Sequence, residues 1–293
     1  MGGKARGMVA CPEPPAAEVG AQILSGGGNA VDAGVATAFA QTVVNPMLAS
    51  LGGCGQFLVY DAIAGRAEVV KAPPMSGSRA VPGVYAPVDG AVIPGVVGGS
   101  RKVEGDRNLR GYAASTIPTL VRGLEEVHRS HGRLPWAEVV RPAVRLARDG
   151  FEVYPYIYRF WDPDRIRPDG VRIADKLAAD PEARKIYLPH GRVPRVGEVL
   201  VQRDLARTLE RIASEGGRVF YDGEIGEAIG RDFESHGGLV TTDDLHWAAP
   251  VVEAPLVGRY GDLMILTDSP PSLGVVLLEI LGILEGIDLR GLG

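Results

Sequence analysis

The sequence has few cysteines and no surplus of positive charge. Its 293 residues include two cysteines, Cys11 and Cys54, too few for a disulfide framework or a four-cysteine metal site. Lys and Arg together number 31 against 36 Asp and Glu, which gives a formal net charge of −5. Because no broad basic field is present to attract a polyanion, we expect a small-molecule substrate and no nucleic acid partner.

Long hydrophobic runs are also missing. No window approaches the length of an apolar membrane span, and the first residues, MGGKARGMVAC, contain no apolar stretch long enough for a secretory signal. We therefore expect a cytoplasmic protein that does not enter a membrane. A hydrophobic content of 45% is nevertheless enough for a globular chain with a substantial core.

Glycine is abundant, and it flanks an apolar helix near the N-terminus. Asn29 is expected to cap a helix over 30–44, with Asp32 in its first turn. Residues 56–61 and 66–71 predict a β-hairpin that follows this helix, so the helix is expected to pack next to a sheet. The glycines at 26–28 lack the Lys-Ser/Thr of a phosphate loop and indicate a tight turn. Those at 52–55 allow close approach of either another backbone or a ligand.

The rest of the chain alternates irregular and helical segments. Residues 72–111 show no clear periodicity, whereas helical patterns are found at 16–24, 117–129, 135–148, 203–214 and 224–235. Residues 251–260 and 263–267 predict a second hairpin. The final helix, expected over 273–284, is apolar on nearly every face and needs a cover that the sequence itself does not provide. Helices in the middle with hairpins near both ends indicate an α+β fold.

Residue types that carry chemistry are present, but they form no complete catalytic set. Cys54 is either a nucleophile or, as is more common, a small packed thiol, and Cys11 is expected to be a small buried residue. His128 and His131 lie one helical turn apart, which suits either a metal or the negative end of the helix dipole. Thr242, in the pair Thr241-Thr242 before Asp243, is expected to cap a short helical turn. We predict no metal site, no cofactor and no catalytic residue within this chain.

Five blocks of sequence, taken together, resemble the large subunit of the γ-glutamyltransferase (γ-glutamyltranspeptidase) family. They are GGNAVDAGVATAFAQTVVNP with GGCGQFLVYDA, TIPTLVRGLEEVHRSHGRLPWAEVVRPAVRLARDGFEV, the stretch from ADPEARKIYLPHGRVP to FYDGEIGEAI, GGLVTTDDL, and PPSLGVVLLEILGILEGIDL. The similarity runs in the expected order from Gly7 to Leu289.

The resemblance implies an N-terminal-nucleophile hydrolase with a four-layer αββα sandwich. Residues 1–293 would form a single domain, the large subunit or a fragment of it, cut by autoproteolysis from a longer precursor. A small subunit whose N-terminal threonine is the nucleophile would complete it as a heterodimer or heterotetramer. The chain would then be part of a hydrolase or acyltransferase whose nucleophile lies on another polypeptide.

One departure from the family pattern concerns the substrate. After the first hairpin the family usually has Arg-Glu-Thr-Ala-Pro, whose arginine pairs with the substrate α-carboxylate, whereas this chain has VVKAPPMSGSRAVP. Depending on where a gap falls, Val70 or Lys71 stands in the place of that arginine, and a lysine supplies a point charge and no bidentate fork. Residues 47–50 also differ from the polar run that the family usually has before the second glycine cluster. We therefore expect an amide-type substrate other than glutathione, with Lys71 and Arg79 as electrostatic substrate contacts.

Other functions remain open at this point. The chain is alternatively part of a true γ-glutamyl hydrolase or transpeptidase, or of a natural-product biosynthetic hydrolase of the same family that cleaves another type of bond. A non-catalytic protein that resembles a large subunit and acts in binding or assembly is a further alternative.

Overall fold

The structure is a computed structural model that describes residues 7–92, 101–162, 172–288 and 291. It contains both helices and antiparallel strands, which confirms the α+β fold class. The helices are α1 (Pro14–Ser25), α2 (Ala30–Val44), α3 (Leu120–His131), α4 (Trp136–Asp149), α5 (Pro155–Trp161), α6 (Ile173–Ala179), α7 (Pro181–Tyr187), α8 (Arg203–Glu215), α9 (Glu224–Ser235), α10 (Thr242–Trp247) and α11 (Gly274–Glu285).

The strands are short and belong to small sheets. They are β1 (Gly55–Asp61), β2 (Arg66–Ala72), β3 (Pro87–Val92), β4 (Arg101–Val103), β5 (Phe151–Glu152), β6 (Val199–Leu200), β7 (Val251–Glu253), β8 (Leu256–Tyr260) and β9 (Leu263–Thr267). One sheet has the order β1-β2-β7, and β3 with β4, β5 with β6 and β8 with β9 form antiparallel pairs. Strands β3 and β4 lie within the segment that we expected to be irregular.

The first glycine cluster makes the tight turn that the sequence predicts. Gly27 has a φ of 96°, a left-handed conformation that suits glycine. Asn29 then begins α2 with a reciprocal capping box, because its side chain accepts a hydrogen bond from Asp32 N and the Asp32 carboxylate accepts one from Asn29 N. These bonds satisfy backbone donors at the start of an otherwise apolar helix.

Helix α2 has different neighbours from those expected. It packs mainly against α1, α4 and α3, and its phenylalanine and valines belong to the main core. Helix α3 instead lies against β1 and β2, and the absence of a side chain at Gly123 allows this approach: a Cβ there would lie 2.6 Å from Ala72 Cβ. The expectation that α2 packs next to the sheet was therefore wrong, because α3 fills that place.

The second predicted hairpin is interrupted. Residues 251–260 form two strands, and the break falls at Ala254 and Pro255. Proline has no backbone N–H to donate and interrupts a strand ladder. As a result β7 pairs with β2, with Val69 opposite Glu253, whereas β8 pairs with β9.

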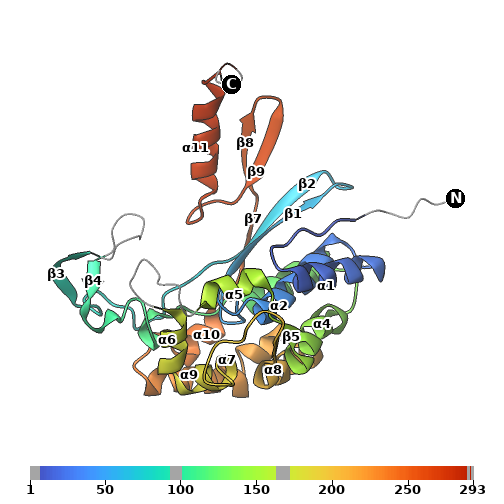
Figure 1. Cartoon of the computed structure of the whole chain (residues 1–293). Helices are drawn as coiled ribbons and strands as arrows, with labels where there is room; N and C mark the ends of the chain where they lie inside the picture. The colour runs from blue at the N-terminus through green and yellow to red at the C-terminus, as the bar shows by residue number, and fades with distance from the viewer. Residues whose placement is uncertain (1–6, 93–100, 163–171, 289–290, 292–293) are drawn as a thin grey trace.

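Strands β8 and β9 and helix α11 form a projecting unit that stands away from the helices of the main body (Figure 1). Helix α11 packs against β8 and β9. Its other side is open to solvent, with exposed fractions of 43% at Leu277, 49% at Ile280 and 68% at Ile283. The described residues therefore leave this helix without the cover that its sequence requires. Among the described residues, no helix is both long and apolar enough to cross a membrane.

Candidate functional site

Lys71, a predicted substrate contact, lies on β2 with its ammonium group buried among oxygen atoms. Its side chain is 6% exposed. Nζ donates hydrogen bonds to Ser269 Oγ at 2.8 Å, to Ser269 O at 3.2 Å and to Pro270 O at 2.7 Å. Glu253 Oε1 lies 3.2 Å away as its ion-pair partner. The oxygen atoms around the ammonium group thus all come from residues of this chain: Ser269, Pro270 and Glu253.

Arg79, the second predicted contact, lies in a different environment. Its guanidinium pairs with Glu234 at 3.0 Å, and both side chains are exposed to solvent. It lines a cavity of about 500 Å³ beside the start of α10, together with Trp247. Among the described residues, Lys71 and Arg79 have no hydrogen-bond or ion-pair partner in common.

The second glycine cluster borders a cavity of about 460 Å³. Its wall includes the end of α2, the segment 46–50, Phe57 and Cys54. Cys54 is exposed, which corrects the expectation of a packed thiol: the preceding turn keeps this residue outside the ladder that starts at Gly55. Residues 47–50, which depart from the family pattern, therefore line the same cavity as the thiol.

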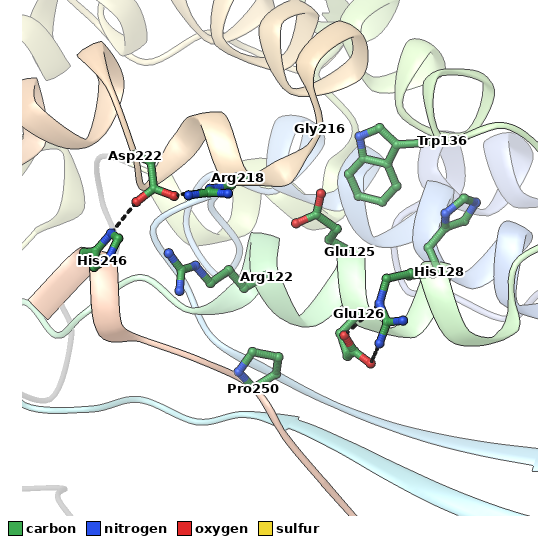
Figure 2. Close-up of a pocket in the computed structure, with 11 residues that line it drawn as sticks. Arg122, Glu125, Glu126, His128, Trp136, Gly216, Arg218, Asp222, His246 and Pro250 are labelled. Atoms are coloured by element: carbon green, nitrogen blue, oxygen red, sulfur yellow. Dashed lines mark hydrogen bonds and ion pairs between the residues drawn. The ribbon is translucent and has the colours of Figure 1, made fainter.

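A groove of about 580 Å³ runs between α3 and the segments that precede α9 and β7 (Figure 2). Its lining residues are Arg122, Glu125, Glu126, His128, Arg129, Trp136, Gly216, Arg218, Asp222, His246 and Pro250. At one end Asp222 binds two basic groups, with His246 Nδ1 and Arg218 Nε each 2.7 Å from its carboxylate oxygens. Burial alone would raise the pKa of Asp222, but these two partners outweigh it and lower the pKa.

This groove is rich in charge pairs, and its lining residues include no hydroxyl or thiol nucleophile. The guanidinium of Arg122 lies 4.3 Å from the centre of the Tyr221 ring and donates to Ala248 O. None of the lining residues is a serine, threonine or cysteine, so the pair of His246 and Asp222 has no hydroxyl or thiol to activate within this part of the described chain. The pairing of His246 with Asp222 was not predictable from the sequence, because the two residues meet only when α10 packs beside the segment before α9.

The two histidines of α3, His128 and His131, each lie near a different carboxylate. His128 Nε2 lies 3.4 Å from Asp32, and His131 Nε2 lies 2.9 Å from Glu68. The described residues contain no cluster of three His, Cys, Asp or Glu side chains able to hold a metal ion. The cap of α10 is Thr241, one residue before the expected Thr242: the Thr241 side chain accepts a hydrogen bond from Asp244 N, and Thr242 is the first residue of the helix.

Cys11 is half-buried near the N-terminus, where its Sγ donates to Glu13 Oε2. Burial and this carboxylate raise the pKa of Cys11 to about 11. The thiol therefore stays protonated at neutral pH, and a protonated thiol is a poor nucleophile.

Comparison with known sequences gives matches over nearly the whole chain. A family model described as gamma-glutamyltranspeptidase matches residues 16–293. The glutathione hydrolase proenzyme of Bacillus subtilis (strain 168) is 30% identical over 284 residues, which are 97% of this chain and 45% of that protein. The acylase ACY 1 proenzyme of Pseudomonas sp. (strain SE83) is 35% identical over 291 residues, covering 98% of this chain and 49% of that protein. The chain thus spans about half the length of these curated relatives.

Solved structures give the same result. The gamma-glutamyltranspeptidase of Helicobacter pylori matches 100% of this chain and 78% of that chain, with a TM-score of 0.87 and 27% identity. The cephalosporin acylase from Bacillus halodurans matches 97% of this chain and 51% of that chain, with a TM-score of 0.74 and 28% identity. These matches confirm the fold expected from the sequence, the large-subunit part of an N-terminal-nucleophile hydrolase.

Proposed function

This chain belongs to the gamma-glutamyltranspeptidase family, and we propose that it is the large-subunit part of a hydrolase or acyltransferase that acts on an amide-type substrate other than glutathione. The observation that carries the proposal is the match across nearly all of this chain to about half of each proenzyme. An exposed apolar side on α11 supports it, because such a surface requires a cover.

In the proposed enzyme a small subunit covers the projecting unit and completes one domain with residues 1–293. The hydroxyl oxygen of its N-terminal threonine attacks the amide carbonyl while the threonine's own amino group takes the hydroxyl proton. The C–N bond then breaks, and the amine leaves with that proton. The resulting acyl-enzyme then passes its acyl group to water or to an amine. The large subunit provides the core and part of the pocket wall, and the assembly is a heterodimer or heterotetramer. Its location in the cytoplasm stays a prediction.

The choice of substrate rests on two segments of this chain. Lysine occupies position 71, and its ammonium already has Glu253 as an ionic partner, so a bidentate arginine contact to a substrate α-carboxylate is not available at this position. Residues 47–50, which differ from the family's usual polar run, line the cavity beside Cys54. Substrate contacts by Lys71 and Arg79 stay predictions, and substitution of each by methionine with measurement of KM tests them.

The experiment that tests this function uses the full-length gene product. We expect mass spectrometry and N-terminal sequencing to find a second polypeptide that begins with threonine. Anilides of γ-glutamate, glutarate and simple carboxylic acids then serve as matched substrates, and we expect faster release of aniline from those without an α-amino acid group. An uncleaved protein that is inactive on the whole panel would favour the non-catalytic alternative. A clear preference for the γ-glutamyl anilide would favour the true γ-glutamyl enzyme.

The natural-product alternative makes a different prediction for the anilide panel. It predicts a processed, threonine-initiated protein that leaves every anilide intact, because its reaction would cleave another type of bond.

A further inference from the structure

The ammonium of Lys71 has its full set of partners inside the protein. An ammonium group has three N–H donors and no acceptor. The two hydrogen bonds to Ser269 and the one to Pro270 match that number, and Glu253 supplies the opposite charge. Ser269 Oγ also donates to Glu253 Oε1. The lysine, the serine and the carboxylate therefore form one closed cluster.

This cluster joins three segments that are distant in the sequence. Lys71 lies on β2 and Glu253 on β7, which pair in the sheet of the main body. Ser269 and Pro270 lie in the loop between β9 and α11, at the base of the projecting unit (Figure 1). The covalent link between the two parts is the short connection at Ala254 and Pro255. The Lys71 cluster is a second attachment of the unit to the sheet.

Burial makes this attachment sensitive to the loss of the charge. The Lys71 side chain is 6% exposed and that of Glu253 is 30% exposed. Removal of Lys71 would leave the Glu253 carboxylate, whose side chain is only partly buried, without its ionic partner. Two backbone carbonyls would also lose their donor. The hydrogen bonds from Ser269 and Lys71 also lower the pKa of Glu253, as a stably ionised partner requires.

We propose that Lys71 is a positioning residue: its ammonium fastens the β9-to-α11 loop to β2 and so holds the projecting unit at one orientation to the sheet. The consequence is that the exposed apolar side of α11 is presented to its partner already oriented. This consequence rests on the proposed function, in which the partner is the second half of the protein. The fastening itself does not depend on it.

Hydrogen exchange measured by mass spectrometry tests the fastening in the full-length protein. We expect Lys71→Met to speed exchange in peptides from β8, β9 and α11 by roughly tenfold or more, since a charged hydrogen-bond network is lost. Peptides from α2 and α4 should exchange as in the wild type. Arg79→Met is the matched control, because it removes a cation that is exposed and whose pair with Glu234 lies on the main body. Unchanged exchange in the projecting unit of Lys71→Met would overturn the proposal.

A double-mutant cycle separates this role from direct substrate contact. Ser269→Ala and Lys71→Met should both speed exchange in the same peptides, and the double variant should add little beyond Lys71→Met, because the two side chains act in one cluster. A Lys71→Met enzyme with a raised KM and an unchanged exchange pattern would identify a substrate contact and refute the positioning role. If the wild-type protein shows no turnover, the proposed function fails while the exchange result still decides the role of Lys71.

Discussion

At the scale of single residues, Glu13 shows how hydrogen bonds stabilise a buried carboxylate. It is 1% exposed, and its oxygens accept hydrogen bonds from Cys11 Sγ, Gln41 Nε2 at 2.6 Å and Asn45 Nδ2 at 2.5 Å. Burial alone would raise the pKa of Glu13, but these three donors outweigh it and the pKa lies below its ordinary value of 4.5. The carboxylate thus ties the start of α1 to the end of α2.

We expect Glu13→Gln to lower the free energy of unfolding by about 1 to 2 kcal/mol, because an amide places N–H groups against donors that now face a carboxylate. Urea denaturation measures the change. Glu18→Gln is the control, since Glu18 is exposed on the same helix.

The stability should also depend on pH. A carboxyl whose pKa is lowered by folding stabilises the folded state above about pH 4.5, and this stability is lost as the pH falls through the folded pKa. Wild-type stability should therefore decline more steeply in acid than that of Glu13→Gln; parallel curves would contradict this account.

Individual residues also show what the sequence could and could not predict. The Asn29 cap was predicted to the residue and the cap of α10 to within one residue, because a cap depends on residues three positions apart. The partners of Lys71 were not, because Ser269 lies 198 positions away and meets β2 only after β7 pairs with it. The exposure of Cys54 depends in the same way on the tertiary position of its turn.

At the scale of elements, the contact between α3 and the hairpin depends on a glycine. A Cβ at Gly123 would lie 2.6 Å from Ala72 Cβ and 2.9 Å from Phe57 Cε2, closer than packed carbon atoms come. Gly34, in α2, would place a Cβ in open space, with nothing within 4 Å. The two glycines therefore make a matched pair, one required by packing and one free to change.

We expect Gly123→Ala to destabilise the protein by about 1 to 3 kcal/mol, because α3 must move away from the sheet. Gly34→Ala should stabilise it by about 0.5 to 1 kcal/mol, because alanine favours a helix over glycine. Thermal and urea unfolding of both variants measure the difference. If the two substitutions change stability in the same direction and by similar amounts, helix propensity and not packing controls both sites.

Elements with strong local patterns were predicted closely, and those that depend on long-range contacts were not. The amphipathic patterns of α4 and α8 were recognised nearly in full. The short helices α5, α6 and α7 were missed, because seven residues carry little periodicity. The partner of β7 could not be read from its residues, since three residues beside a proline are compatible with either hairpin.

At the scale of the whole molecule, the described residues leave surfaces that a folded monomer normally covers. Strands β1 and β7 are the edges of their sheet, and side chains of Leu58, Tyr60, Val251 and Val252 are exposed on them. Unpaired strand edges and contiguous apolar surface indicate a protein interface. In Figure 1 the strands β1 and β2 and the projecting unit lie on the same side of the main helices, and we expect one partner to contact both.

A charge placed on α11 tests this interface directly. In the full-length protein we expect the double substitution Ile280→Asp with Ile283→Asp to weaken assembly by roughly 2 to 4 kcal/mol, because about half of Ile280 and two thirds of Ile283 remain for a partner to bury. Burying the introduced carboxylates adds a further cost. Size-exclusion chromatography and the fraction of cleaved precursor measure assembly. Ile63→Asp is the control, because Ile63 is fully exposed in the turn between β1 and β2. Assembly and cleavage at wild-type levels in the double variant would mean that the partner does not contact this side of α11, and the interface would then have to lie on the sheet edges alone.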